Sequence, residues 1–278
     1  MCLLADNSAM ETLPQLLHAS LWTRSLTAGQ VARVEAETVV RTLPLGVPVC
    51  RKGEPVEHWI GIIDGLVKMT SMNSAGKTTT FLGVTSGGWF GEGSLLKDRH
   101  RKYDVVTLRE SRVAYMPRAT FEWLLDTSIE FNRFLLLQLN ERLGQFIGMV
   151  ENERLLETDA RVARSLASLF NPLLYPEQAT DVQLSQEEVG YLTGVSRQRV
   201  NQSLQVLERA GLIRVEYGRL RILDLDGLRC FPEPSQAGML GRATPPETAI
   251  AAERARSASS HSARSGVARP RKRSESSR

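Results

Sequence analysis

Short runs of alternating apolar and polar residues, separated by turn residues, occupy the chain from residue 41 to residue 117. This period of two is typical of strands in a small antiparallel β domain. The run Trp59–Ile63 is followed by Asp64-Gly65 and then by the run Leu66–Met69. Because Asp-Gly readily takes the positive φ angles of a two-residue turn, we predict a β-hairpin at this point.

Further strands are predicted in the same region. Asn73–Gly76 forms a second turn ahead of a strand at residues 79–84, which Gly87-Gly88 ends. Turn residues of this kind punctuate strands because they tolerate backbone angles that other residues avoid. Two more strands are predicted at residues 103–108 and 112–116.

After Pro117 the spacing of apolar residues becomes that of helices. We predict a short helix near residues 120–125 and a long one from residue 129 to residue 156. Apolar residues three and four apart make one stripe along the long helix, namely Leu135, Leu139, Leu143, Phe146 and Val150. A helix of about 25 residues spans about 40 Å, which is more than a small domain needs for its own core. We therefore predict that this stripe packs on the same helix of a second copy, the alternative being that it packs on the β domain.

Residues 185–211 carry the start and stop signals of two consecutive helices. Ser185 and Glu188 have the spacing of a capping box, and Gly194 can end the helix that they begin. Ser196 caps a second helix, Arg197 to Ala210, which Gly211 ends. The small Gly190 allows the two helices to approach closely, so the sequence predicts a helix-turn-helix.

Polar side chains collect on one face at the start of the second of these helices. Val200, Leu204 and Leu207 make the buried face. The other face carries side chains that can bind base edges or phosphates, namely Ser196, Arg197, Gln198, Arg199, Asn201 and Gln202. In the major groove Arg pairs with guanine, and Asn or Gln pairs with adenine. We predict a DNA-reading helix, and the alternative interpretation is a solvated helix face.

A small wing is predicted after this helix. Two short strands at residues 212–215 and 220–222 are joined by a turn at Tyr217-Gly218. Such a wing can place Arg219 or Arg221 near the DNA backbone.

Charge is unevenly distributed along the 278 residues. The net formal charge is +4, but residues 232–278 hold nine Lys or Arg against four Glu. The tail therefore carries +5 and the rest of the chain −1, so a DNA-binding function depends on local patterning rather than on overall charge. Apolar periodicity also stops at Phe231, which predicts a disordered tail.

Several protein classes are disfavoured. No stretch approaches the roughly 18 uninterrupted apolar residues of a membrane span, and acidic residues stand where a signal peptide has positive charge. We expect a cytoplasmic protein with no membrane partner. Cys2, Cys50 and Cys230 are too scattered for a disulfide framework or a metal site. The sequence has no Ser/His/Asp set, metal-ligand spacing or phosphate loop, so we expect no catalytic residues, no metal and no enzyme activity.

Residues 40–229 resemble the Crp/Fnr family of bacterial regulators. The segment LSQEEVGYLTGVSRQRVNQSLQVLERAGLI is similar to the family's helix-turn-helix, and IGIIDGLVKM followed by GGWFGEGSLL at residues 87–96 is similar to its cyclic-nucleotide-binding β-roll. The resemblance implies an α+β fold with an N-terminal antiparallel β-roll of the jelly-roll-like, cyclic-nucleotide-binding type, a long dimerisation helix and a C-terminal winged helix-turn-helix. It also implies homodimers that bind palindromic double-stranded DNA sites and act on RNA polymerase.

The resemblance and the patterns together divide the chain into five parts. We expect a helical or irregular lead-in at residues 1–40, a β-roll sensor domain at 41–126, a dimerisation helix at 127–157, a winged helix-turn-helix at 158–230 and a disordered basic tail at 231–278.

The family's effector pocket is only partly matched. In members that bind cyclic AMP, a Gly-Glu pair contacts the ribose and an Arg-Ser pair about ten residues later takes the cyclic phosphate. Gly91, Glu92, Gly93 and Ser94 match the first part, whereas the second part reads Arg101-Lys102-Tyr103-Asp104. Lys102 supplies charge without the fork of an arginine, Tyr103 fills the room of a serine, and Asp104 places a negative charge near an anion.

We therefore expect no required cofactor. A β-roll turn kept without a ligand, or an unknown effector, is favoured over a cyclic nucleotide. Other ligands of the family also find no match, because an iron–sulfur form needs several N-terminal cysteines and a haem form needs a partner for His58 or His100.

The leading hypothesis is a homodimeric transcription regulator modulated by its β-roll. Gln198 and Gln202 stand where many family members carry Glu and Arg, so the operator is expected to differ from the common half-site. The alternative hypothesis is a β-roll effector-binding subunit that regulates a partner enzyme and uses its C-terminal unit to dock a protein.

Overall fold

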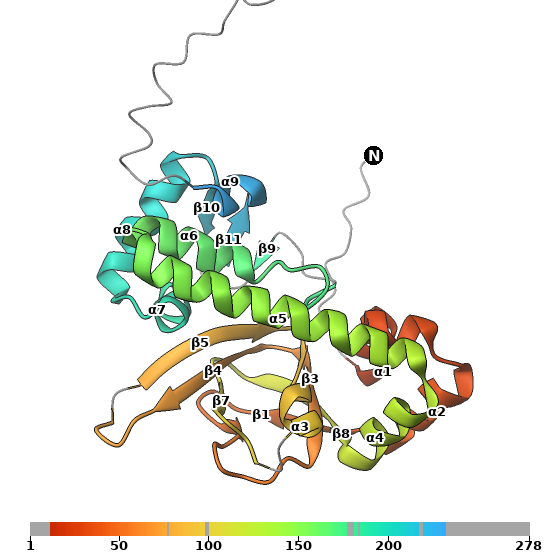
Figure 1. Cartoon of the computed structure of the whole chain (residues 1–278). Coiled ribbons are helices and arrows are strands. Elements are labelled where there is room, and N and C mark those ends of the chain that lie inside the picture. The colour runs from red at the N-terminus through yellow and green to blue at the C-terminus, as the bar shows by residue number, and fades with distance from the viewer. Residues whose placement is uncertain are drawn as a thin grey trace, which may run out of the picture. The chain divides into compact units, whose positions relative to one another are not determined.

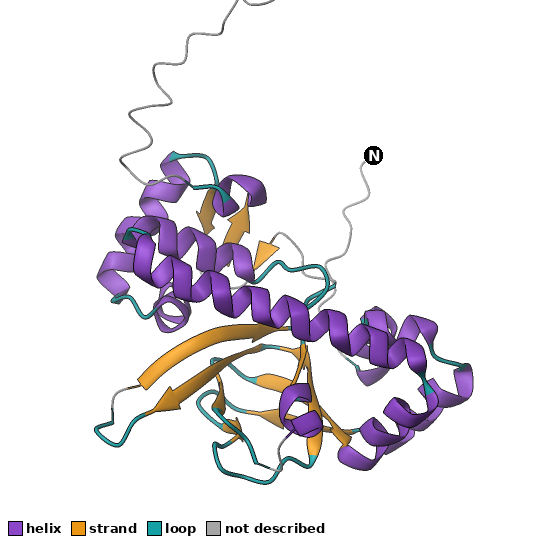
Figure 2. Cartoon of the chain, viewed as in Figure 1, coloured by secondary structure: helices purple, strands orange, loops and turns teal. Residues whose placement is uncertain are grey.

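The computed structural model describes residues 12–76, 78–97, 100–176, 181–182, 184–216 and 219–231. Cys2, the turn at Tyr217-Gly218 and the predicted tail beyond Phe231 lie outside the described residues. Below, the N-terminal half means residues 12–128 and the C-terminal half means residues 158–231. A long helix lies between them in the chain, and Figures 1 and 2 show the strands of the N-terminal half gathered on one side of it.

Within the described residues, the N-terminal half contains two four-stranded antiparallel sheets, as predicted for a β-roll. The first has the order β1-β8-β3-β6, with strands Val39–Leu43, Ser111–Pro117, His58–Asp64 and Trp89–Phe90. The second has the order β2-β7-β4-β5, with strands Pro48–Cys50, Asp104–Thr107, Leu66–Met72 and Thr78–Thr85. The two sheets share a core that contains Ile60 and Ile62 from β3, and Val67 and Val84 from β4 and β5.

The predicted hairpin at Asp64-Gly65 is wrong. Strand β3 pairs with β6 and β8, and β4 pairs with β5 and β7, so the chain crosses from one sheet to the other at Gly65. The residues from Trp59 to Ile63 are all buried, which means that both faces of β3 are covered. A strand of this kind gains more from a place in a two-layer core than from an edge hairpin with one wet face. The turn at Asn73–Gly76, by contrast, does join the antiparallel pair β4 and β5.

Short helices surround one end of the β-roll. They are α1 (Leu13–Ala19), the 3-10 turn η1 (Leu21–Ser25), α2 (Ala28–Glu37), α3 (Glu92–Lys97) and α4 (Arg118–Thr127). They enclose an aromatic cluster with ring centroids 4.6 to 5.6 Å apart, made of Trp22, Trp59, Trp89, Phe121 and Phe131. Aromatic side chains bury large apolar areas, so this cluster anchors the start of the long helix.

The long helix α5 (Ile129–Leu155) confirms the prediction from its apolar periodicity. Its buried face, Phe131, Leu135, Gln138 and Arg142, packs within the chain. The opposite face leaves Leu136, Leu143, Ile147 and Val150 exposed. This second set, called the α5 seam below, has spacings of seven, four and three, which is the repeat of a two-helix contact.

The predicted apolar stripe therefore divides between the two faces of α5. Leu135 is only 2% exposed and belongs to the core around the aromatic cluster. The ring of Phe146 meets that of Phe81 on β5, with centroids 6.4 Å apart. Leu143 and Val150 lie on the exposed α5 seam, at 57% and 43% exposed. The apolar spacing along α5 is compatible with burial of either face, because a helix has 3.6 residues per turn. Contact with β5 decided which of these residues are covered.

The C-terminal half consists of helices around a small sheet, as predicted for a helix-turn-helix with a hairpin. Its elements are α6 (Thr158–Ser168), β9 (Asp181–Val182), α7 (Gln186–Thr193), α8 (Arg197–Arg209), β10 (Ile213–Glu216), β11 (Arg219–Ile222) and α9 (Leu225–Arg229). The three strands have the order β10-β11-β9. Among the described residues, no helix is both long enough and apolar enough to cross a membrane.

Candidate functional site

The turn between α7 and α8 has the geometry that the sequence predicted. Ser185 and Glu188 form both hydrogen bonds of a capping box, and Gly194 ends α7 at a φ of 66°. A Cβ at Gly190 would lie 3.0 Å from the Val195 carbonyl oxygen, a tight contact that glycine avoids at this close approach. These local features fix the angle at which α8 leaves the turn.

Helix α8 presents a polar face at its N-terminal end. Ser196 caps the helix by accepting a hydrogen bond from the Arg199 amide at 3.4 Å. One face of α8 is buried within the C-terminal half, namely Val200, Ser203, Leu204 and Leu207. Exposed on the other side are Ser196, Arg197, Gln198, Asn201 and Gln202. This end of the helix therefore carries the hydrogen-bonding groups and free amides that major-groove recognition uses.

Arg199 differs from the other side chains predicted for DNA contact. Its Nη2 lies 2.9 Å from Asp159 Oδ1, and the same oxygen accepts a hydrogen bond of 2.6 Å from Ser203. Asp159 is in the first turn of α6. Arg199 therefore ties α8 to α6 in this structure, and its predicted contact with DNA stays a prediction. No local pattern indicates this pair, because 40 positions separate the two residues.

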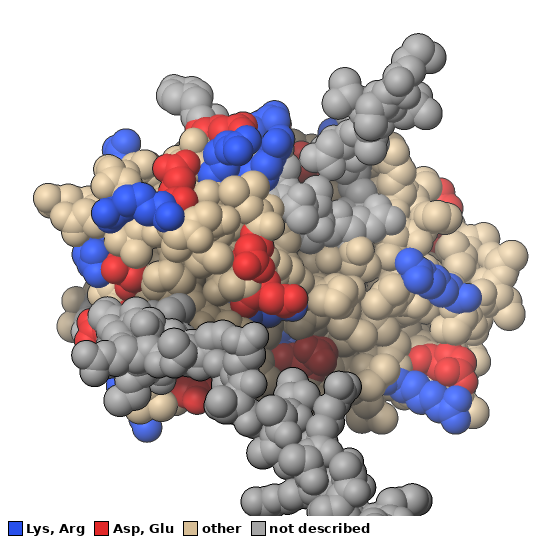
Figure 3. Space-filling model, turned by 90° about the horizontal axis from the view of Figure 1, so that it is seen from above, with Lys and Arg blue, Asp and Glu red and all other residues tan. Residues whose placement is uncertain are grey.

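Polar residues outside α8 are also exposed or half-buried; two of them, Arg219 and Arg221, are predicted for the wing, and two others, Gln186 and Arg214, are not predicted. Gln186 on α7 donates a hydrogen bond of 3.2 Å from Nε2 to Asn201 Oδ1, which holds the Asn201 amide in place. Arg214 on β10 is exposed, as are Arg219 and Arg221 on β11. Figure 3 shows small separate groups of Lys and Arg beside Asp and Glu on the face that it views. On this face the basic groups are scattered rather than gathered into one patch.

The other candidate site lies where strand β6 meets helix α3. Gly91 has a φ of 98°, and the carboxylate of Glu92, which is 4% exposed, accepts a hydrogen bond of 3.4 Å from Trp59 Nε1. Ser94 is also buried, and a Cβ on Gly93 would come within 4.0 Å of Leu139 on α5. Of the predicted pocket residues of this segment, Gly91, Glu92 and Ser94 are therefore buried, whereas Gly93 is exposed.

The cation of this interior is Arg101, not the predicted Lys102. The side chain of Lys102 is exposed, whereas Arg101 is 4% exposed. Arg101 Nη2 donates to the His58 carbonyl oxygen at 2.6 Å, and Nη1 finds no hydrogen-bond partner among the described residues. A Cβ at position 91 would lie 2.3 Å from that Nη1, so Gly91 makes room for it. Side chains alternate between the interior and the solvent along the residues that lead into β7. This alternation decides which of the two adjacent cations is buried, and a shift of one residue in the sequence alignment reverses the assignment.

A second buried cation comes from α5. Arg142 donates from Nη2 to the Trp89 carbonyl oxygen at 3.1 Å and from Nη1 to Tyr175 at 3.0 Å, and its Nε has no partner among the described residues. Burial acts to lower the pKa of Arg142, but Tyr175 and Glu92 outweigh it and the pKa is raised. In contrast to its effect on the arginine, burial raises the pKa of the Tyr103 phenol, so that group stays neutral.

The β-roll interior thus has an excess of positive charge. Its buried charged side chains among the described residues are Arg101, Arg142 and Glu92. Two guanidinium groups are buried with one carboxylate, and each of the two has an N–H donor without a partner among the described residues. Buried charge is costly unless it is paired, so such an interior favours an anion. Asp104 is only half-buried, and its carboxylate accepts a hydrogen bond from the Lys52 amide at 2.9 Å.

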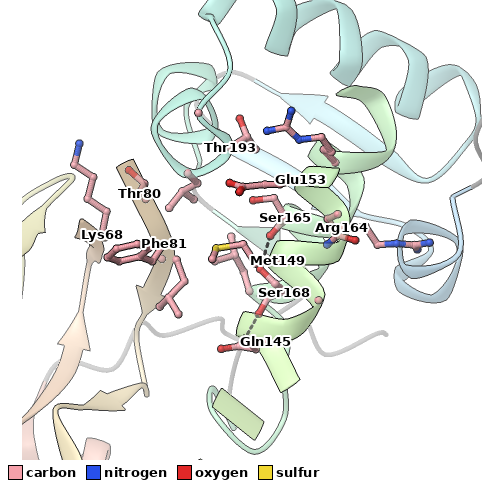
Figure 4. Close-up of a pocket in the computed structure, with 18 of the residues that line it drawn as sticks. Lys68, Thr80, Phe81, Gln145, Met149, Glu153, Arg164, Ser165, Ser168 and Thr193 are labelled. Atoms are coloured by element: carbon pink, nitrogen blue, oxygen red, sulfur yellow. Dashed lines mark hydrogen bonds between the residues drawn. The ribbon is translucent and has the colours of Figure 1, made fainter. Parts of the chain in front are cut away.

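A cavity of about 680 Å³ separates parts of the two halves. Figure 4 shows Lys68, Thr80 and Phe81 of the β4–β5 pair on one side, facing residues of α5, α6 and α7. Glu153 and Arg164 lie across from the strands, with Gln145 hydrogen-bonded to the Ser168 carbonyl oxygen at 3.2 Å. The two halves therefore meet around an open space beside the apolar packing of Leu66 and Leu108 on the C-terminal half.

Models of two domain families match the chain. A cyclic nucleotide-binding domain matches residues 40–128, and a Crp-like helix-turn-helix domain matches residues 160–231. The residues between these matches contain all of α5, including Arg142. The first match covers the segment from Gly91 to Asp104, and the second covers α7 and α8.

Curated relatives match the chain over most of their own length. The transcriptional regulator SdrP of Thermus thermophilus is 26% identical over 186 residues, which are 66% of this chain and 88% of that protein. A CRP-like cAMP-activated global transcriptional regulator of Mycobacterium tuberculosis is 29% identical over 189 residues, 66% of this chain and 84% of that protein. Both are named as regulators of transcription.

Solved structures share the fold. FixK2 of Bradyrhizobium japonicum superposes with a TM-score of 0.59 at 16% identity, covering 69% of this chain and 96% of that one. The c-di-GMP responsive regulator CLP of Xanthomonas campestris has a TM-score of 0.51 at 24% identity, with 70% and 99% covered. The two domain models in this order, together with these relatives, show that the chain belongs to the Crp/Fnr family of transcriptional regulators.

Proposed function

We propose that the protein is a homodimeric regulator that binds a palindromic operator in the cytoplasm and acts on RNA polymerase. The observation that carries the DNA contact is the exposed polar face of α8, where Arg197, Gln198, Asn201 and Gln202 flank the capped N-terminus. A helix end of this kind reads base edges in the major groove. Arg199 supports that face through Asp159.

The proposed dimer forms through the α5 seam. Leu136, Leu143, Ile147 and Val150 are exposed in the single chain although all are large and apolar. Gly144, next to Leu143, has no atom within 4 Å of a Cβ built on it, so the chain leaves space beside the seam. Two copies related by a two-fold axis cover both seams at once, and they present two α8 helices to a two-fold symmetric operator.

The proposed effector is a small anion of the cyclic-nucleotide class held in the β-roll. Arg101 Nη1 beside Gly91 is the donor for its phosphate, and Glu92 is the acceptor for its hydroxyl groups. The unpaired donors of Arg101 and Arg142 fit a negatively charged group. Several curated relatives are named as cAMP-activated, which supports the same ligand class.

The operator proposal is tested with Arg197→Ala. A palindromic duplex enriched from a random pool by the unaltered protein is titrated by fluorescence anisotropy at fixed salt. Losing one bidentate base contact is expected to weaken binding by about 1 to 3 kcal/mol, roughly 5- to 150-fold.

The matched control is Arg209→Ala, which removes the same charge from the other end of α8, where the side chain bonds to the Gln205 carbonyl oxygen. Its effect is expected to be smaller and the same for all sequences. If the two variants lose affinity equally, or no duplex is enriched, the operator proposal fails and the C-terminal half is better explained as a protein-docking unit.

A further inference from the structure

The C-terminal half sends one short segment into the β-roll. This latch segment, Asn171–Pro176, follows α6 and is shaped by Asn171. The Asn171 side chain accepts hydrogen bonds from the amides of Leu173 and Leu174 at 2.9 and 3.1 Å. Its Nδ2 donates to Glu141 Oε2 on α5 at 2.9 Å. The segment is therefore a built turn attached to α5, not a loose connection.

Leu174 and Tyr175 of this segment are part of the β-roll core. They are 3% and 2% exposed, and they pack with Ile60, Val84 and Phe90. A Cβ at Gly88 would lie 2.8 Å from the Tyr175 ring, so the ring occupies space that any other residue there would fill. The Tyr175 hydroxyl donates to the Gly83 carbonyl oxygen at 2.9 Å. The C-terminal half thus supplies an apolar and hydrogen-bonded side chain to the interior of the other half.

The same hydroxyl is bound by a cation of the candidate effector site. Arg142 Nη1 lies 3.0 Å from it, and Arg142 Nη2 donates to the carbonyl oxygen of Trp89, three residues before Glu92. Arg142 therefore links the segment of the effector site to Tyr175. Its Nε has no partner among the described residues, so an anion in the interior can draw the guanidinium toward itself and away from Tyr175.

The latch segment is one of several contacts between the halves. A cavity of about 680 Å³ lies beside it, and Figure 4 shows this open space between the strands and the helices. Leu66 and Leu108 belong to the apolar core of the C-terminal half, and an ion pair of 2.7 Å joins Arg109 to Glu188. Among these contacts, Tyr175 is buried and hydrogen-bonded inside the β-roll, so loss of its hydroxyl is expected to loosen the halves.

We propose that Tyr175 is a latch that holds the C-terminal half against the β-roll, and that an anion bound in the β-roll competes with it for Arg142. The competition rests on the proposed effector, whereas the latch does not. By linkage, whatever loosens the latch must strengthen anion binding, and anion binding must loosen the latch. Tyr175 is a positioning residue, since it acts on the effector site through Arg142.

The test uses Tyr175→Phe in the full chain, which keeps the ring and removes the hydroxyl. Hydrogen–deuterium exchange followed by mass spectrometry reports on residues 158–176, and calorimetry measures the affinity for cyclic AMP. Exchange of residues 158–176 is expected to be roughly five- to ten-fold faster. Cyclic AMP is expected to bind several-fold more tightly, because Arg142 is released; a merely structural loss would weaken it.

The matched control is Tyr191→Phe. Tyr191 also lies between the halves, where Lys68 Nζ is 4.3 Å from its ring centroid, but its hydroxyl bonds to Glu187 of the same helix. This variant is expected to match the unaltered protein in both measurements.

Two outcomes overturn the proposal: unchanged exchange in Tyr175→Phe, or faster exchange with equal or weaker cyclic AMP binding. If cyclic AMP binds neither protein, the proposed effector is wrong, and the exchange comparison alone decides the latch.

Discussion

At the scale of single residues, burial separates two adjacent cations in the β-roll. Arg101 is buried with one unsatisfied donor, whereas Lys102 is exposed. An ion pair in the interior is far stronger than one in water, because water screens the charge of an exposed lysine. The two residues carry the same charge. Their different burial alone is therefore the reason to expect different effects when each is replaced.

Arg101→Gln is expected to weaken cyclic AMP binding by roughly 10- to 150-fold, the effect of losing one charged hydrogen bond. Lys102→Gln removes the same charge from the exposed neighbour and is expected to stay within about two-fold, as for a screened surface charge. Isothermal titration calorimetry measures both. An equal loss in both variants would contradict the assignment of Arg101, and no binding by the unaltered protein would contradict the effector itself.

At the scale of elements, the corner at Gly65 determines how the β-roll is assembled. Gly65 has a φ of 121°, and a Cβ there would lie 2.3 Å from the Ser111 hydroxyl oxygen. The amides of Gly65 and Leu66 donate to the hydroxyls of Ser86 and Ser111, so side chains satisfy the backbone where the chain leaves one sheet. The corner therefore needs glycine for its backbone angle and for its space.

Gly65→Ala is expected to lower the free energy of unfolding by at least about 2 kcal/mol, because backbone strain adds to the clash with Ser111. Gly46→Ala is the control, since Gly46 has a φ of 78° but nothing within 4 Å of a built Cβ. It is expected to cost about 1 kcal/mol. Urea unfolding followed by tryptophan fluorescence compares the two, and a Gly65 variant as stable as the Gly46 variant would be inconsistent with the corner.

At the scale of the whole molecule, the two faces of α5 have different tasks. One face packs on the aromatic cluster and carries Arg142 to Tyr175, so it joins the two halves of one chain. The α5 seam remains exposed, and an apolar stripe of that length favours a partner helix. A dimer would thus be built on the back of the helix that connects the effector site to the C-terminal half.

Ile147→Glu is expected to convert the proposed dimer to a monomer at micromolar concentration. The two-fold axis would place two carboxylates in one apolar contact, which weakens association by at least roughly a hundred-fold. Sedimentation equilibrium measures it, and Leu45→Glu, at an exposed apolar residue away from α5, is the control. A dimer that survives Ile147→Glu unchanged would place the interface elsewhere.

Local interactions explain what the sequence by itself determined. The capping box at Ser185 and Glu188, the left-handed Gly194 and the cap at Ser196 follow from residues within a few positions of one another. The apolar periodicity of α5 likewise depends only on residues in adjacent turns of one helix. Such features form from short-range hydrogen bonds and backbone preferences, so they can be recognised in any chain that carries them.

Contacts between distant residues explain what only the tertiary structure decided. Four features depend on residues far apart in the chain. They are the sheet that β4 joins, the burial of Arg101 rather than Lys102, the pairing of Arg199 with Asp159 and the insertion of Tyr175 beside Arg142. Asp64-Gly65 is compatible with a hairpin and with a corner between sheets, because turn chemistry restricts backbone angles and not the partner of the next strand. Burial of both faces of β3 selects the corner, and that burial exists only once the two sheets are packed together.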